Sequence, residues 1–386
     1  MTDGNSPVAV LDDPRSPAPK SGPETIRESG ATVAGGVSGV GGVPETLQDV
    51  IEVEGAARDA PDAPSSVRAY LFHSDEAVRE VALSEVGGLL PSEENFVWVD
   101  LSGFGEADLR RVADVLGLSR ASVHAALSPW QRPRIDVYGE VFFVTATVPR
   151  TDDQAYRVYA AELDLFVGHN FLVGAHKRPL PFHDRAMARA EQNPGLMQED
   201  SSFLLYIVLD ELLDYYEGLV EGMNDQIERM EERALTDTSD DYLGDLLHLK
   251  RYVYALGRIA QQHREVLVAF TRPDFPFTSR EEMEPYFRDL ENRHAQLIDT
   301  LDRARDAVNG AFDIYVSHVS HRMNRVMQVL TVVSATLLPT TVILGFWGTS
   351  VEGLPLYTPA GFLLMVAVIA LTTIGSLTVF RRKGWL

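Results

Sequence analysis

The sequence predicts an α+β domain, then long helices, then a C-terminal two-helix transmembrane hairpin. Three observations support this fold class. Two 21-residue stretches near the end of the chain, 326–346 and 360–380, contain no Asp, Glu, Lys or Arg. Short strand-like runs mixed with helical patterns fill residues 70–175. After Pro194 the strand-like runs stop, and helical periodicity takes their place.

Composition and periodicity divide the chain into four segments. They are a disordered acidic tail at 1–65, an α/β cytoplasmic domain at 66–195, long cytoplasmic helices and a stalk at 196–325, and a transmembrane hairpin with a short external loop and a basic C-terminus at 326–386. The tail is rich in Gly, Pro, Ala, Ser and acidic residues, so it buries too little apolar surface to become ordered. No apolar segment with a basic leader lies near Met1, so we expect no cleaved signal peptide.

Within these segments the pattern predicts individual elements. Strands are expected at 70–73, 96–101, 134–138, 141–148, 158–166 and 171–175, and helices at 106–116, 119–127, 197–235 and 242–270. A further helical pattern runs from about residue 279 into the first apolar stretch, with only Pro285 near its start. Continuous to Phe346, this helix would be roughly 100 Å long at about 1.5 Å per residue, which is the length of a stalk rather than of a packed helix.

The two apolar stretches are expected to cross a membrane. Each would be about 31 Å long as a helix, which matches the hydrocarbon core of a bilayer. Arg322 and Arg325 precede the first stretch and a basic segment at 381–383 follows the second, whereas the loop at 348–359 has no Lys or Arg. The positive-inside tendency therefore predicts a multi-pass protein of the cell membrane with both termini in the cytoplasm.

Composition excludes several classes of function. The chain of 386 residues has no cysteine, which excludes disulfides, thiolate zinc sites and cysteine nucleophiles. Its net charge of -22 argues against nucleic acid as a partner and favours cations. No Walker, GxSxG or HExxH motif occurs, so we expect neither an enzyme nor an ATP-driven pump, and no cofactor.

A polar stripe follows one face of the predicted stalk and first membrane helix. Its members recur at alternating spacings of three and four residues: Asp313, Val316, Ser320, Asn324, Met327, Thr331, Ser334, Leu338, Thr341 and Gly345. In a helix bundle these positions would be mostly Leu, Ile and Val. The polar residues therefore favour a water-filled path. Two membrane helices cannot enclose a path, so this interpretation requires a homo-oligomer with the first helix inside and the second outside.

Close packing of membrane helices is the alternative explanation of this stripe. Ser, Thr and Gly allow helices to approach one another, and off-stripe Thr336 and Thr340 are expected to bond to their own backbone. Asp313 and Asn324 favour the path, because rings of carboxylates and carboxamides attract a cation and orient its water.

A second regular feature is an acidic face on the helix expected at 197–235. Its members are Asp210, Asp214, Glu217, Glu221, Asp225, Glu228 and Glu232. Pairing with basic residues of the following helix, His248, Lys250, Arg251, Arg258 and Arg264, is one explanation. A surface that concentrates cations near the path is the other.

Several short motifs lie along most of the chain. In the apolar stretches and their flanks they are Asn-Arg-Val-Met-Gln-Val-Leu-Thr at 324–331, Pro339, Gly-Phe-Trp-Gly at 345–348 and Arg-Arg-Lys-Gly-Trp-Leu at 381–386. Upstream they are Gln-Arg-Pro-Arg at 131–134, Pro-Tyr-Phe-Arg-Asp at 285–289 and Asp-Ile-Tyr-Val-Ser at 313–317. In their order and spacing these segments resemble the CorA family of divalent-cation transporters, and the similarity covers about 67–386.

The resemblance implies a homopentamer with an α/β/α cytoplasmic funnel, a long stalk helix around the pore and an outer membrane helix. It places Asp313, Asn324, Thr331, Thr341 and Gly345 at pore-facing positions, and Met327 and Leu338 at a hydrophobic constriction. Mg²⁺ is then the implied substrate and a regulator, because it keeps most of its hydration water in such a path.

Two sites depart from the family pattern. At the outer mouth, Gly348, Thr349 and Ser350 replace the Gly-Met-Asn signature, and Glu352 is the one acid retained in the loop. At the family's regulatory divalent-ion site, Asp289 matches one acidic partner, whereas His124 and Ala125 replace the expected acidic pair. His124 with Asp289 would favour a softer ion such as Zn²⁺.

Three functional interpretations stay open from the sequence. The leading one is an oligomeric channel or transporter for divalent cations, with Mg²⁺ first and Co²⁺ or Ni²⁺ after it. The second is a Zn²⁺ or other transition-metal transporter of the same superfamily. The third is a non-conducting, membrane-anchored sensor or assembly partner, for which Ser350 is the main support.

Overall fold

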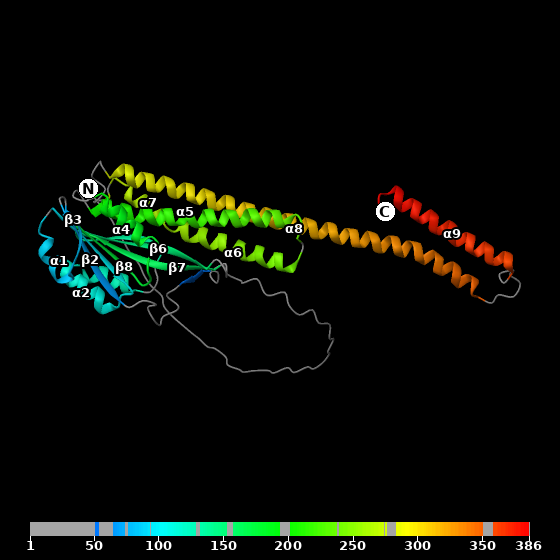
Figure 1. Ribbon diagram of the computed structural model, residues 1–386, viewed down its shortest axis with the longest axis horizontal. Coiled ribbons are helices and arrows are strands. Elements are labelled where there is room, and N and C mark those ends of the chain that lie inside the picture. Colours follow the sequence, from blue (N-terminus) through cyan, green and yellow to red (C-terminus); the bar gives the residue numbers. More distant parts are fainter. Residues whose placement is uncertain are drawn as a thin grey trace, which may run out of the picture. The chain divides into compact units, whose positions relative to one another are not determined.

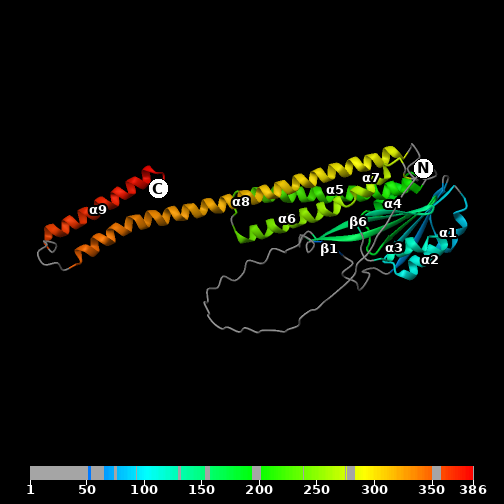
Figure 2. The ribbon, with the colours of Figure 1, turned by 180° about the vertical axis from the view of Figure 1, so that it is seen from behind.

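The computed structural model describes residues 51–53, 65–73, 76–92, 94–128, 132–152, 157–193, 201–237, 239–273, 275, 283–349 and 358–385. Figures 1 and 2 show their elements from two opposite sides. The expected disordered tail lies outside these residues, except for Ile51–Val53 and Ser65. Ile51–Val53 is a short strand, so this part of the expected tail belongs to the sheet.

The described part of the N-terminal domain contains one mixed eight-stranded sheet. Its strands are β1 (Ile51–Val53), β2 (Ser66–His73), β3 (Glu76–Val81), β4 (Asn95–Ser102), β5 (Arg134–Tyr138), β6 (Val141–Asp152), β7 (Arg157–Val167) and β8 (Phe171–His176). The order is β3-β2-β4-β8-β7-β6-β5, and β1 pairs in parallel with β7. β4 and β8 are parallel, and the other neighbours in this order are antiparallel.

All six strands expected from the sequence are present, and two further strands were not predicted. β3 carries Glu76, Arg79 and Glu80, so its sequence lacks the apolar alternation of a buried strand. Its place at the edge of the sheet explains those charges, because charged side chains discourage pairing with another chain. β1 is three residues long, too short to give a period-two signal.

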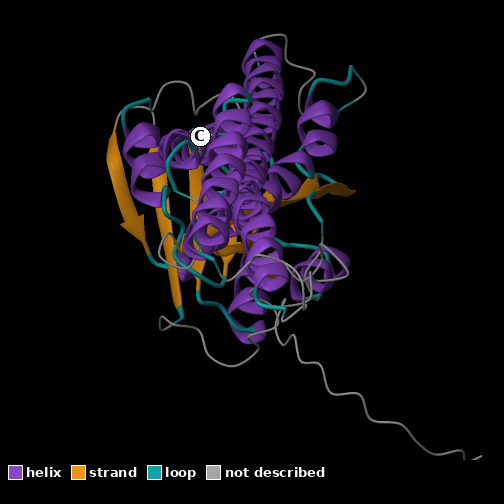
Figure 3. Cartoon of the chain, turned by 90° about the vertical axis from the view of Figure 1, so that its right-hand side faces the viewer, coloured by secondary structure: helices purple, strands orange, loops and turns teal. Residues whose placement is uncertain are grey.

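Helices cover both faces of the sheet (Figure 3). On one side lie α1 (Leu83–Leu89), α2 (Glu106–Leu116) and α3 (Arg120–Leu127); on the other lie α4 (His183–Glu191), α5 (Ser201–Ala234), α6 (Asp240–Gln261), α7 (Arg264–Phe270) and the start of α8 (Glu284–Trp347). Adjacent residues of β6 show the alternation: Phe142 packs in the cluster with α5–α8, and Phe143 packs in the cluster with α2 and α3. The layers are therefore α/β/α.

Local signals account for several helix boundaries. The Ser119 hydroxyl accepts a hydrogen bond from the Ser122 N–H at 3.0 Å, which caps the start of α3. Gly117 ends α2 in the left-handed conformation with φ 69°. The expected helices at 106–116 and 119–127 are confirmed to within one residue, whereas α1 and α4 were not predicted.

One expected helix, 242–270, is divided in the structure. α6 ends at Gln261 and α7 begins at Arg264. Between them the His263 N–H bonds to the Ala260 carbonyl three residues back, and the buried side chain of His263 bonds to the sheet. Its Nε2 accepts the Thr147 N–H of β6 at 2.9 Å, and its Nδ1 lies 3.2 Å from the Ile259 carbonyl. Because Nε2 accepts a hydrogen bond and Nδ1 donates one, the ring is the neutral tautomer with its proton on Nδ1. Helical periodicity on both sides of His263 hid this break.

The longest element, α8, is a continuous helix of 64 residues from Glu284 to Trp347. At about 1.5 Å per residue it is about 96 Å long, as expected for a stalk. Pro285 lies in its first turn, and Pro339 lies within the helix. α9 (Pro359–Arg382) follows, and its N-cap Thr358 accepts the Gly361 N–H at 3.1 Å. Both helices contain 18-residue windows apolar enough to span a bilayer, with mean hydropathy 2.0 in α8 and 2.3 in α9.

Buried His263 predicts a specific pH dependence of stability. Burial, and after it the nearby His294, lower the pKa of His263 to about 4, against backbone hydrogen bonds that raise it. The unfolded chain would take up this proton below about pH 6.5 while the folded chain does not. Stability from this group is therefore lost as pH falls from about 6.5 to 4, by up to about 1.4 kcal/mol per pH unit.

The test is thermal unfolding of the detergent-solubilised chain between pH 7 and pH 5. His263→Gln keeps an acceptor for Thr147 but cannot titrate, so its melting temperature should fall less over this range. Equal pH slopes in the two proteins would contradict the assignment.

Candidate functional site

The polar stripe predicted on the stalk is exposed along its whole length. Within one chain its exposed residues are Asp313, Val316, Ser320, Asn324, Met327, Thr331, Ser334, Leu338, Thr341 and Gly345. Met327 and Leu338 are 59% and 63% exposed, as are apolar residues off the stripe such as Leu330, at 64%. The structure thus leaves this face of α8 available to other copies of the chain or to water.

The opposite face of α8 packs on the rest of the chain. Several of its buried or half-buried positions lie two residues after stripe positions, which is about 200° around a helix: Tyr315, Thr336, Ile343 and Trp347. The buried Val332 lies one residue after Thr331, about 100° from it. Before the apolar stretch α8 contacts α5, α6 and α7, and in the apolar stretch it contacts α9. The stripe therefore points away from every helix that α8 contacts extensively in its own chain.

The stripe continues beyond the limit that sequence analysis set at Asp313. Asp299, Asp302 and Asp306 are exposed, and the same spacing of three and four joins them to Asp313 through Asn309. Each is followed two residues later by a buried residue: Leu301, Ala304 and Val308. The spacing alone would have found these three carboxylates. They were missed because the sequence interpretation stopped at the first acidic position.

The stripe hydroxyls are oriented by their own helix. The Thr331 hydroxyl donates to the Met327 carbonyl at 2.7 Å, and the Thr341 hydroxyl donates to the Leu337 carbonyl at 2.9 Å. Off-stripe Thr336 and Thr340 make the same bond, as expected from the sequence. A hydroxyl whose proton is held in this way presents oxygen lone pairs outward. Exposure, rather than this bond, distinguishes the stripe from the other threonines.

The outer end of α8 is only partly described. Gly348 N–H bonds to the Leu344 carbonyl at 3.0 Å, and the Thr349 hydroxyl donates to the Phe346 carbonyl at 2.6 Å. A Cβ at position 348 would lie 3.3 Å from the Leu344 oxygen, so glycine suits this turn. Ser350 and Glu352, the other predicted residues of the outer mouth, lie outside the described residues.

The two candidate metal ligands His124 and Asp289 are not brought together within one chain. His124 is exposed on α3, which packs on one face of the sheet. Asp289 is exposed on α8 between Phe287 and Leu290, which pack on the other face. Across the described residues there is no group of three or more His, Asp or Glu arranged to hold a metal ion. A site formed by this pair would need a second copy of the chain.

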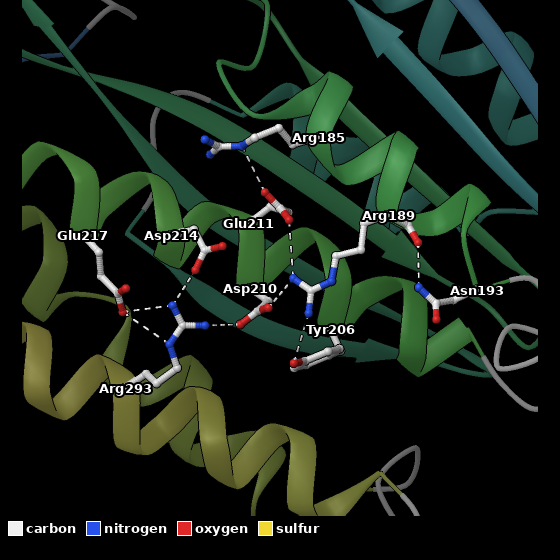
Figure 4. Close-up of polar contacts among 9 residues, drawn as sticks. All are labelled: Arg185, Arg189, Asn193, Tyr206, Asp210, Glu211, Asp214, Glu217 and Arg293. Carbon is white, nitrogen blue, oxygen red and sulfur yellow. Dashed lines mark hydrogen bonds and ion pairs between the residues drawn. The ribbon is translucent and has the colours of Figure 1, made fainter.

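The first half of the acidic face of α5 pairs with arginines of α4 and α8. Asp210 is buried and pairs with Arg189 of α4 and Arg293 of α8, and Arg293 also pairs with Asp214 and Glu217 (Figure 4). The sequence interpretation named basic residues of 242–270 instead. It missed Arg293 because that residue is distant in the sequence. Glu221, Asp225, Glu228 and Glu232 are exposed, so the second half of this face meets solvent.

Comparison with known proteins agrees with this architecture. Residues 93–382 match the family model described as CorA-like Mg²⁺ transporter protein. The chain belongs to the CorA-like family. In Thermotoga maritima, a cobalt/magnesium transport protein CorA is 28% identical over 319 residues, covering 81% of this chain and 91% of the relative. A zinc transport protein ZntB of Pectobacterium atrosepticum is 20% identical, covering 82% and 98%.

Among solved structures, the CorA magnesium transporter of Methanocaldococcus jannaschii superposes with a TM-score of 0.69 at 22% identity. The match covers 83% of this chain and 99% of that one. The CorA-like fold of a soluble α/β domain, a long helix and two C-terminal apolar helices is therefore shown. Membership of a transporter family also identifies the two apolar helices as the membrane part of the chain.

The proposed regulatory pair in this CorA-like chain gives a direct prediction. If His124 of one copy and Asp289 of another bind Zn²⁺, His124→Ala should weaken Zn²⁺ binding to the detergent-solubilised chain by about tenfold, the factor for a loss of about 1.4 kcal/mol. Isothermal titration calorimetry measures it. The matched control is His169→Ala, which removes another exposed histidine. An unchanged isotherm in the His124 variant would remove this site.

Proposed function

We propose that the chain passes divalent cations, Mg²⁺ first and Co²⁺ or Ni²⁺ after it, through a homo-oligomeric path lined by α8. The observation that carries this proposal is the exposed polar stripe of α8. It lies opposite the face that packs on α5, α6, α7 and α9. A polar face of a membrane helix is costly against lipid, so it favours water, ions or the same face of another copy.

The side chains along the stripe suit a hydrated hard cation. Asp299, Asp302, Asp306 and Asp313 would form successive carboxylate rings that raise the local concentration of cations. Asn324 follows with a carboxamide, and Thr331 and Thr341 offer oriented hydroxyl oxygens. Mg²⁺ gives up its hydration water reluctantly, and oxygen groups of this kind can bond to that water. Met327 and Leu338 would narrow the path and exclude water when it is closed.

Assembly and topology are parts of the same proposal. A pentamer is supported by the family and by the need for several α8 helices around one path. The basic residues before α8 and after α9 favour a cell-membrane protein with both termini in the cytoplasm. An inside-negative potential would then draw cations inward, with about 2.3 kcal/mol per charge at 100 mV.

Zn²⁺ or another transition metal is the second candidate cargo. It is favoured by His124 in place of a carboxylate, by Ser350 in place of the signature Asn, and by the similarity to a protein named for zinc transport. A non-conducting sensor or assembly partner is the remaining alternative, for which Ser350 is the sequence support.

Flux measurements distinguish these candidates. The chain is reconstituted into liposomes, and uptake of Mg²⁺, Co²⁺, Ni²⁺ and Zn²⁺ is followed with an internal indicator under an inside-negative potential. We expect Mg²⁺ uptake. Uptake of Zn²⁺ without Mg²⁺ would support the second candidate, and no uptake of any of the four ions would defeat both transport proposals.

Substitutions on the stripe test the path itself. Asp313→Asn and Asn324→Ala should each lower the initial rate of uptake, by about tenfold for Asp313→Asn, because a ring of charges that concentrates the ion is lost. Thr331→Val should also change the rate. Thr340→Val is the matched control, since it removes the same kind of backbone-bonded hydroxyl from a half-buried, off-stripe position. Wild-type rates in all stripe variants would mean that the stripe is a packing surface only.

A further inference from the structure

One arginine joins the stalk helix to the cytoplasmic domain by an unusual number of ionic bonds. Arg293 of α8 donates hydrogen bonds to Asp210, Asp214 and Glu217 of α5, with its Nη2 3.0 Å and its Nε 3.3 Å from the Glu217 oxygen. These four residues are called the Arg293 clamp below. The three carboxylates recur at spacings of four and three, so they share one face of α5.

The clamp is anchored deeper than a surface ion pair. Asp210 is only 3% exposed, and it also accepts a hydrogen bond from Arg189 of α4. The adjacent Glu211 is buried too, and pairs with Arg185 at 3.1 Å and Arg189 at 3.4 Å. Figure 4 shows α4, α5 and α8 joined through these side chains. Removing one member of such a group leaves another charge uncompensated, so the arrangement is held more firmly than an exposed pair.

The position of Arg293 on α8 suits it to oppose rotation of the helix about its axis. Arg293 lies between the buried residues Leu290 and Leu297, and at about 100° per residue its side chain leaves the helix about 60° to one side of the buried face that they form. Apolar contacts of the buried face, such as those of Leu290 and Leu297, are non-directional and tolerate small rotations. Charge-assisted hydrogen bonds at the flank have defined geometry and oppose rotation about the helix axis.

We propose that Arg293 is a positioning residue: its bonds to Asp210, Asp214 and Glu217 fix the rotation of α8 and so hold the stripe from Asp299 to Gly345 toward the path. This inference rests on the proposed conduction path. The backbone hydrogen bonding of α8, which is uninterrupted as far as Pro339, carries the orientation from Arg293 to the stripe residues, the nearest of which is Asp299, less than two turns away. Loosening of the clamp would turn the polar face partly away from the path and expose its neighbours there.

Arg293 stays protonated in the clamp. Burial by itself would lower the pKa of Arg293, but the hydrogen bonds that it donates to Asp214 and Glu217 and the charges of Asp210 and Glu217 raise it above the usual arginine value. The clamp therefore responds to what happens to its carboxylates, which are 42% exposed at Asp214 and 43% at Glu217.

The chain has no cysteine, which permits a direct measurement of rotation. Two single-cysteine reporters are made, Ser320→Cys on the stripe and His321→Cys about 100° away at nearly the same depth. Each is placed in the otherwise unchanged full chain in liposomes, and disulfide-linked dimers are counted after oxidation. Around a central path, stripe cysteines of neighbouring copies meet more often, so the Ser320-to-His321 cross-linking ratio measures the orientation of α8.

We expect Arg293→Met to lower this ratio by about tenfold, which corresponds to about 1.4 kcal/mol of lost orientational preference. The double variant Asp214→Asn/Glu217→Gln, which leaves no buried charge unpaired, should lower it in the same direction. Arg303→Met is the matched control, because Arg303 is an exposed arginine of α8 that bonds to Thr300 of its own helix. Arg293→Lys should restore part of the ratio.

Each outcome decides one question. A structural role alone would lower the melting temperature of Arg293→Met and leave the ratio unchanged, and that result in a folded oligomer would overturn the proposal. If Arg293→Met does not fold, the double variant decides in the same way. A parent chain with equal cross-linking at Ser320 and His321 would instead contradict the conduction path on which this inference rests.

Discussion

The two faces of α8 constrain the rest of the structure. One face buries apolar side chains against α5, α6 and α7, and in the apolar stretch it contacts α9. The other face carries the stripe from Asp299 to Gly345, which is exposed except at Asn309, a half-buried residue that bonds to Tyr254 of α6. Both faces repeat every three and four residues, so they keep the same offset along the helix and do not drift into one another. A helix with this pattern is stable only when the helices of its own chain cover the apolar face and other copies or water contact the polar face.

Much of the fold could be predicted because its signals are local and strong. Six strands, the helices α2, α3 and α5, and the exceptional length of α8 follow from periodicity and from the position of prolines. β3 was missed because charged edge strands do not alternate, and the break at His263 was missed because a side chain of one helix bonds to a backbone group of the sheet. Such long-range bonds leave no periodic trace in the sequence.

The candidate site likewise has residues that could be predicted from local spacing and residues that could not. The stripe from Asp313 to Gly345 could be predicted because a helix converts spacing directly into position. The partners of the acidic residues on α5 could not, since Arg293 is 76 to 83 residues away along the chain and meets them only after α8 folds back on α5. Placement of His124 and Asp289 on opposite faces of the sheet likewise depends on the order of the strands, which no single segment encodes.

Pro339 interrupts the backbone hydrogen bonding of the long helix α8. Proline has no N–H, so the Ala335 carbonyl lacks its usual donor four residues later and the backbone is softer there. A rotation of α8 that starts near Arg293 would then be carried fully as far as Ser334 and less fully to Thr341 and Gly345. The parts of α8 before and after Pro339 are thus joined by a stretch of backbone that bends more easily than the rest of the helix, although Thr336, before the proline, lies 3.4 Å from Ser376 of α9.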